Sequence, residues 1–232
     1  PSFWRGFFLV LRMKFSARWY PCGLAVIVAI LYGQFLWNPL VFDDANFFFD
    51  PAVADGYSSS WFHFSFRWFS YASLGWTKRL FGLDLIWFRL GNLLLHAAVV
   101  IALFHLNRQL ISLLRIGEEE ESEIKKRDLA AFVVALVFAV HPAGVYGVGY
   151  LIERSIVMAT LFVLLMLMTF IKGIETKKTG WLLLSATFYF LAVFSKEHSV
   201  PAPGLAVLIA LLARESSWTY WRRFVLPFLL YG

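Results

Sequence analysis

The sequence predicts an all-α protein, a polytopic bundle of helices that crosses a membrane. Hydrophobic residues make up 60% of the 232 residues and charged residues only 16%, whereas soluble domains have about 45–50% and about 25%. The mean hydropathy is +0.68. The apolar residues form long runs, not the short alternating segments of an outer-membrane barrel. Cys22 is the single cysteine, which excludes a disulfide scaffold.

Six apolar runs and the start of a seventh predict the membrane-spanning helices. The third run is well short of the about 20 residues that a spanning helix needs. We read the first run as an uncleaved signal anchor. Because the chain begins with Pro1 and the last run is cut at Gly232, we expect a single transmembrane domain, 1–232, from the N-terminal part of a longer protein. The runs cover residues 19–37, 85–106, 129–140, 155–171, 181–194, 200–213 and 224–232.

The distribution of basic residues predicts the orientation. Cytoplasmic loops are enriched in Lys and Arg, and most of the 21 basic residues share one side if the N-terminus is cytoplasmic. The loop 38–84 is then extracytoplasmic. We expect an integral protein of a bacterial inner membrane, or of the endoplasmic reticulum membrane in a eukaryote, with the lipid bilayer as a partner. The net charge of +6 reflects this bias, so no nucleic-acid partner is predicted. The sequence specifies no oligomeric state.

The outer loop 38–84 carries two notable features. Asp43 and Asp44 follow the first span directly, and the segment 61–81 is rich in Trp, Phe and Tyr. Amphipathic aromatic rings favour the membrane interface. We therefore expect a helix in this loop that lies in the interface and covers a site at the outer face.

Polar residues inside the second span lie on one helix face. Arg89, Asn92 and His96 are spaced i, i+3 and i+7. Since polar groups in lipid are costly, this face must point into the bundle. Hydrogen bonding between helices is the plain alternative to a functional role.

Further polar residues cluster at the predicted outer ends of the later spans. His141 ends the third span, Arg154 opens the fourth, and Lys196, Glu197 and His198 connect the fifth and sixth. For Arg154 the alternative is an interfacial anchor, and for Lys196 and Glu197 it is an ion pair that holds the turn.

These residue types suit the transfer of a sugar from a lipid phosphate. A carboxylate such as Asp43 can deprotonate an acceptor hydroxyl as general base. Arg and Lys can offset the negative charge that grows on the departing phosphate. A transporter with an acidic ion site would use similar residues, and a catalytically silent membrane subunit could retain the same scaffold.

Three stretches carry a resemblance to a known family. They are VFDDAN at 41–46, FRLGNLLLHA at 88–97, and HP at 141–142 followed by Val148 and Arg154. Their order resembles the GT-C superfamily of polyprenyl-phosphate-sugar glycosyltransferases, in particular its protein O-mannosyltransferase-like branch. The pair Lys196-Glu197 also fits. The outer loop departs from the family pattern, because it lacks the Arg-Pro that the family often has.

The resemblance implies a GT-C-type bundle and a role for each site residue. Asp43 is implied as catalytic base with Asp44 beside it, and Arg154 as donor-phosphate ligand supported by Lys196. The donor would be a polyprenyl-phosphate sugar, and the acceptor a protein Ser or Thr, for instance in a pilin, or a glycan. No organic cofactor is implied, and a divalent cation, which only Asp43 and Asp44 would hold, is not favoured. Surrounding residues are His141, Glu197, His198 and Arg89, with Asn92 and His96 assigned to structure.

Overall fold

The computed structural model describes residues 17–45, 65–114 and 120–212, in which all regular elements are helical. This confirms the predicted all-α helical membrane bundle. The predictions for 46–64, which include the start of the aromatic segment, and for the seventh run, 224–232, fall outside the described residues. The elements are η1 (Ala17–Trp19), α2 (Tyr20–Tyr32), η2 (Gly33–Trp37), α5 (Trp68–Phe81), α6 (Leu85–Leu114), α7 (Glu121–Ala139), α8 (Gly144–Gly149), η3 (Leu151–Glu153), α9 (Arg154–Thr176), α10 (Thr179–Ser195), η4 (Glu197–Ser199) and α11 (Pro203–Leu212).

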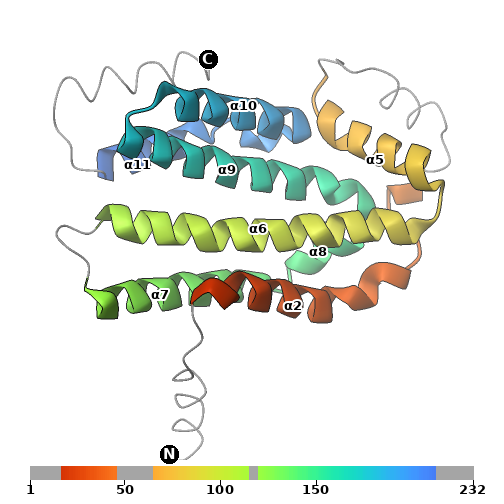
Figure 1. The fold of residues 1–232 in the computed structure, drawn as a ribbon. Coiled ribbons are helices and arrows are strands. Elements are labelled where there is room, and N and C mark those ends of the chain that lie inside the picture. The colour runs from red at the N-terminus through yellow and green to blue at the C-terminus, as the bar shows by residue number, and fades with distance from the viewer. Residues whose placement is uncertain (1–16, 46–64, 115–119, 213–232) are drawn as a thin grey trace, which may run out of the picture.

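The long helix α6 runs through the middle of the bundle (Figure 1). Helices α2 and α7 pack on one side of it, and α9 packs on the other, with α10 and α11 beyond α9. Helix α5 lies at the end of the bundle where α6 begins. The chain therefore brings the start of α6, the α8–η3 segment and the end of α10 to the same end.

Three segments of the described chain are long and apolar enough to cross a membrane: Tyr20–Trp37, Leu85–Leu114 and Leu151–Thr176. The second reaches eight residues beyond its predicted end, because its last two turns contain Asn107, Arg108 and Gln109 but are still helical. Helix α7 begins at Glu121, well before the predicted apolar run. Its acidic first turn suits the positive end of the helix dipole, and Glu121 also bonds Lys125 at 2.6 Å.

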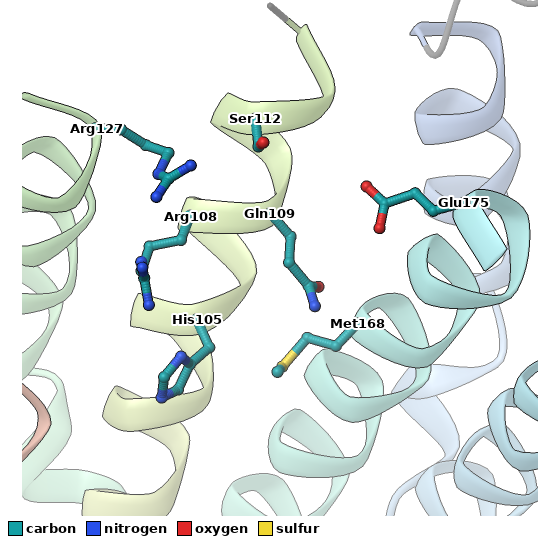
Figure 2. A pocket seen from close by; sticks show the side chains of 7 residues that line it. All are labelled: His105, Arg108, Gln109, Ser112, Arg127, Met168 and Glu175. Atoms are coloured by element: carbon teal, nitrogen blue, oxygen red, sulfur yellow. The ribbon is translucent and has the colours of Figure 1, made fainter. Parts of the chain in front are cut away.

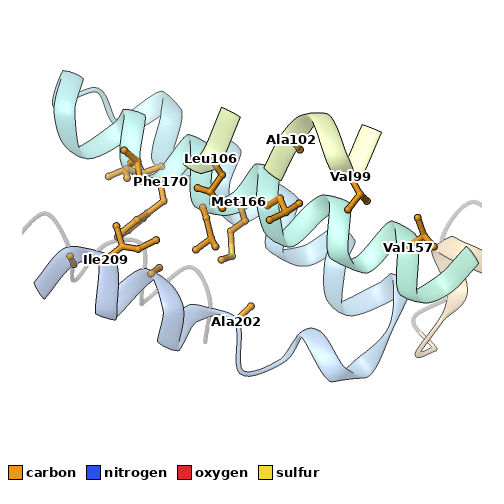
Figure 3. Close-up of a cluster of buried hydrophobic side chains, with 14 residues drawn as sticks. Val99, Ala102, Leu106, Val157, Met166, Phe170, Ala202 and Ile209 are labelled. Carbon is orange, nitrogen blue, oxygen red and sulfur yellow. The ribbon is translucent and has the colours of Figure 1, made fainter. Parts of the chain in front are cut away.

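The largest cluster of buried hydrophobic residues joins α9 to α6, α10 and α11 (Figure 3). Helices α9 and α10 form a close hairpin, since a Cβ at Gly173 would lie 2.5 Å from Leu182 Cδ2. Lys177, in the left-handed region with φ 58°, ends α9 and allows the chain to reverse. A second cluster joins α2, α6, α7 and α8.

Helix α5 corresponds to the second half of the aromatic segment predicted to cover the outer site. It begins after Arg67 and ends at Gly82, whose φ of 68° suits glycine. The Ser70 hydroxyl donates a 3.1 Å hydrogen bond to the carbonyl of Ser195, the last residue of α10. This contact fixes α5 to the end of the bundle.

Candidate functional site

The acidic pair splits into one buried and one exposed carboxylate. Asp44 is fully buried, and its carboxylate accepts hydrogen bonds from the backbone N–H groups of Ile152 at 3.0 Å, Leu151 at 3.2 Å and Val41 at 3.4 Å. Burial raises the pKa of the Asp44 carboxyl, and the three hydrogen bonds act in the opposite direction. Asp44 thus ties the chain after α2 to η3.

Asp43 is exposed and contacts Tyr150. The Tyr150 hydroxyl donates to Asp43 Oδ2 at 3.2 Å and accepts a 3.4 Å hydrogen bond from the Asp43 backbone N–H. Burial and the neighbouring carboxylates raise the pKa of Tyr150 to about 12, so its hydroxyl remains a donor at neutral pH. Phe42, at φ 48°, makes the turn that points the two acids in different directions.

The polar face of α6 holds the backbone around this pair. The buried guanidinium of Arg89 donates to the carbonyls of Gly149 and Pro39, the latter at 2.6 Å. The Asn92 amide nitrogen lies 3.3 Å from the carbonyl of Leu151. Arg89 therefore connects α6 to the segment that carries the two acids, and Asn92 connects α6 to η3, which binds Asp44.

His96 lies deeper in the bundle and makes no hydrogen bond through Nε2 within the described residues. Its ring packs edge-on against Tyr32, with ring centroids 5.0 Å apart. The ring of Phe138 is tilted against it, with ring centroids 5.9 Å apart. The ring of His96 therefore packs between two aromatic side chains, and its assignment to structure stays a prediction.

Arg154 is 3% exposed and is hydrogen bonded to two other helices, α6 and α5. Its guanidinium donates to Asn92 Oδ1 at 2.7 Å and to the Phe88 carbonyl at 2.8 Å, both on α6. It also reaches α5, at Thr77 Oγ1 (3.0 Å) and the Ser73 carbonyl (3.3 Å). The approach to α6 needs a glycine, because a Cβ at Gly91 would lie 2.8 Å from Arg154 Nη2.

Lys196 reaches the same end of the bundle from α10. Its ammonium lies 3.5 Å from Glu153 Oε2 and 3.4 Å from Ser155 Oγ. Both side chains of this ion pair are largely buried. Because Glu153 ends η3 and Tyr150 precedes it, this short segment links Lys196 to the acidic pair.

Glu197 forms a bidentate salt bridge with Arg67, which precedes α5. Hydrogen bonds from Arg67 lower the pKa of Glu197 to about 2. His198 is exposed and lies at the edge of a mainly apolar cavity of 350 Å³ between α9 and α11. The lining also includes Thr160, Val163, Leu164, Pro201 and Leu205.

The structure brings six of the predicted residues together, whereas Glu197 and His198 lie in the neighbouring η4 turn and two histidines lie apart. Asp43, Asp44, Arg89, Asn92 and Arg154 surround η3 or the residues beside it, and Lys196 joins them through Glu153. His141 lies apart in the α7–α8 turn. Its Nδ1 accepts a 3.2 Å hydrogen bond from the backbone N–H of Ala143, and His96 packs between aromatic rings.

Three residues of the site did not stand out in the sequence as site candidates: Tyr150, Glu153 and Arg67. Each is the partner of a predicted residue: Tyr150 of Asp43, Glu153 of Lys196, and Arg67 of Glu197. Glu153 could have been found by its position next to Arg154. The described residues include no group of three or more His, Cys, Asp or Glu arranged to bind a metal ion.

Comparison with known proteins indicates a distant relationship of the chain. No protein-family model matches the chain, and no solved structure matches it significantly. Mouse protein O-mannosyl-transferase TMTC1 is 25% identical over 228 residues, an alignment that covers 83% of this chain and 22% of the mouse protein. The chain thus spans about a fifth of that relative's length. The similarity supports a distant O-mannosyltransferase-like relationship and the membrane location that the apolar helices indicate.

Proposed function

We propose that the chain is the membrane-embedded part of a glycosyltransferase with Asp43 as its general base. It transfers a sugar from a polyprenyl-phosphate donor to an acceptor hydroxyl, of a protein Ser or Thr or of a glycan, on the extracytoplasmic side. The observation that carries the proposal is the difference between the surroundings of the two carboxylates in the acidic pair. Asp44 is enclosed by backbone N–H groups, whereas Asp43 is exposed beside a phenol that orients it.

Asp43 has the properties that a general base requires. One carboxylate oxygen accepts the Tyr150 hydrogen bond, and the exposed side chain leaves room for a hydroxyl to approach. A base must come within about 2.6–3.2 Å of the proton donor that it serves. Tyr150 restricts the rotation of the carboxylate, which favours such an approach.

We propose that Lys196 contacts the donor phosphate. Its two contacts, at 3.4 and 3.5 Å, are long for hydrogen bonds, and an ammonium has three N–H donors, so Lys196 can donate to a phosphate while it stays beside Glu153. His198, two residues further on, opens onto the apolar cavity of 350 Å³. A prenyl chain fits the chemistry of that lining, with its phosphate near Lys196.

We propose a smaller role for Arg154 in binding the donor phosphate than the family resemblance implies. A guanidinium has five N–H groups, and four of those of Arg154 are used by α5 and α6. A single N–H on Nη2 remains for a phosphate among the described residues. We propose that the main contribution of Arg154 is to hold α5 over the site and that its charge offsets that of the phosphate.

Single-turnover transfer from a labelled polyprenyl-phosphate sugar tests the proposal. Asp43→Asn keeps the shape of the side chain but cannot take up a proton, so transfer should fall by about 10²–10⁴-fold, while donor binding changes little. Asp84→Asn is the matched control. Asp84 is an exposed aspartate of the same loop that caps the start of α6 through the N–H of Ile86, and asparagine preserves that cap.

A wild-type rate in Asp43→Asn would contradict the catalytic assignment. The chain would then be better described as a silent membrane subunit or a transporter that retains the scaffold. Adding a chelator to the wild-type protein separates a metal-dependent reaction from one that needs only the two acids. Loss of transfer on chelation would show that the reaction requires a divalent cation.

A further inference from the structure

A polar groove of 300 Å³ lies at the opposite end of the bundle from the candidate site, within the size range of small ligand pockets. The floor is one face of α6, formed by residues spaced i, i+3, i+4 and i+7: His105, Arg108, Gln109 and Ser112. Figure 2 shows Arg127 reaching in from α7 on one side and Glu175 from α9 on the other.

One wall of the groove carries two guanidinium groups that a buried acid holds in place. Asp128, 3% exposed, accepts hydrogen bonds from Arg108 Nε at 2.7 Å, Arg108 Nη2 at 3.2 Å and Arg127 Nε at 3.1 Å. The Nη1 group of Arg108 has no hydrogen-bond partner among the described residues, so this wall offers a guanidinium N–H group to an anion.

The other wall offers acceptors and negative charge. The buried side-chain oxygen of Gln109 has no hydrogen-bond partner among the described residues, and a buried acceptor of this kind requires a donor. Glu175 forms no salt bridge within the described chain, because the nearby Lys172 ammonium lies over the ring of Trp181, 4.1 Å from its centroid. Helices α6 and α9 both end here, and their C-terminal carbonyls favour a cation.

We propose that this groove binds a phosphate ester of a primary amino alcohol, as in the headgroup of an ethanolamine phospholipid. The phosphate lies against Arg108 and Arg127, and the ammonium donates to Gln109 and Glu175. The two walls suit the two charges of a single zwitterion. A choline headgroup can place its phosphate against the same two arginines. Its quaternary nitrogen has no N–H to donate to Gln109 and Glu175.

A membrane lipid is the source that the location favours. The groove opens beside the last turns of two segments long enough to span a membrane, where headgroups lie. Lys125, Lys126, Lys177 and Lys178 are at the same end, and such clusters of basic residues attract phospholipid headgroups.

Native mass spectrometry of the purified chain with added lipids of identical acyl chains tests the proposal. The wild type should bind the ethanolamine lipid about tenfold more tightly than the choline lipid, the effect of one or two hydrogen bonds between charged groups. Glu175→Gln should abolish this preference. Arg127→Gln should weaken both lipids about equally, and Asp84→Asn, at the start of α6 and so at the opposite end of the bundle, should change neither.

Soluble phosphoethanolamine and inorganic phosphate form the second arm. Displacement of the lipid by phosphoethanolamine at a comparable concentration would assign the site to a soluble ester of the same chemistry. Equal binding of the two lipids by the wild type, with no effect of phosphoethanolamine, would overturn the proposal. A preference that survives Glu175→Gln in a variant with an unchanged melting temperature would overturn it as well.

Discussion

The Asp44 carboxylate accepts a 3.0 Å hydrogen bond from the backbone N–H of Ile152, 108 residues further along the chain. This contact joins the end of the first membrane-spanning segment to the start of another. It also leaves the neighbouring Asp43 as the carboxylate that faces outward. The acidic pair therefore consists of an exposed carboxylate, Asp43, followed by a buried carboxylate, Asp44, that holds the backbone of η3.

Removing the Asp44 carboxylate should destabilise the fold. Asp44→Ala leaves buried backbone N–H groups without acceptors and should cost about 1–3 kcal/mol of unfolding free energy. Asp44→Asn should cost less, because the amide oxygen still accepts. Denaturation in detergent measures the effect, and Asp43→Ala, an exposed change, should stay within about 0.5 kcal/mol. Equal loss in the two alanine variants would contradict the assignment of Asp44 to structure.

A substitution at Gly91 tests how Arg154 is positioned without removing the arginine. Gly91→Ala places a methyl group where the guanidinium packs, 2.8 Å from Nη2, and should destabilise the fold by about 1–3 kcal/mol. Arg154→Ala should slow transfer by about 10²-fold. Arg154→Lys should recover only part, because an ammonium cannot reach all four acceptors. Full transfer activity in Arg154→Ala would mean that the arginine matters only for anchoring.

Acid should weaken the contact between α5 and the η4 turn. The pKa of Glu197 is lowered from 4.5 to about 2 by Arg67, so its stabilisation is present above pH 4.5 and is lost as pH falls toward 2. The pair is partly exposed, and such pairs contribute about 0.2–1 kcal/mol. Melting temperatures between pH 7 and pH 3 should therefore fall less in Glu197→Gln than in the wild type. Arg67→Gln should show the same flattening, and the double variant should add nothing.

The proposed orientation can be tested by chemical labelling. With Cys22 replaced by alanine, Asp43→Cys should react with an impermeant thiol reagent in intact cells, because position 43 is exposed at the outer end. Lys126→Cys and Lys177→Cys should react only after permeabilisation. Reaction at position 177 from outside intact cells would reverse the orientation.

Hydropathy alone predicted the fold class and most of the helices. The apolar runs at 19–37, 155–171 and 181–194 each differ from the observed helices by a few residues. The second run was too short, because Asn107 and Arg108 looked like the end of a span. These residues instead continue α6 along a polar groove. An apolar run indicates which residues can face lipid. The helix itself extends as far as its backbone hydrogen bonds continue, which includes polar residues.

The sequence by itself determined most of the polar residues that gather at the end of the bundle near η3, because the alternation of spanning helices brings their ends to common faces. It did not determine which of them are exposed. Asp43 and Asp44 are adjacent and chemically identical, and only the turn at Phe42 and the N–H groups of Leu151 and Ile152 make one buried and the other open. The tertiary structure likewise decided that Tyr150, Glu153 and Arg67 are the side chains that contact the predicted site residues. Such pairs depend on side-chain distances across the bundle, and residue order along the chain does not encode those distances directly.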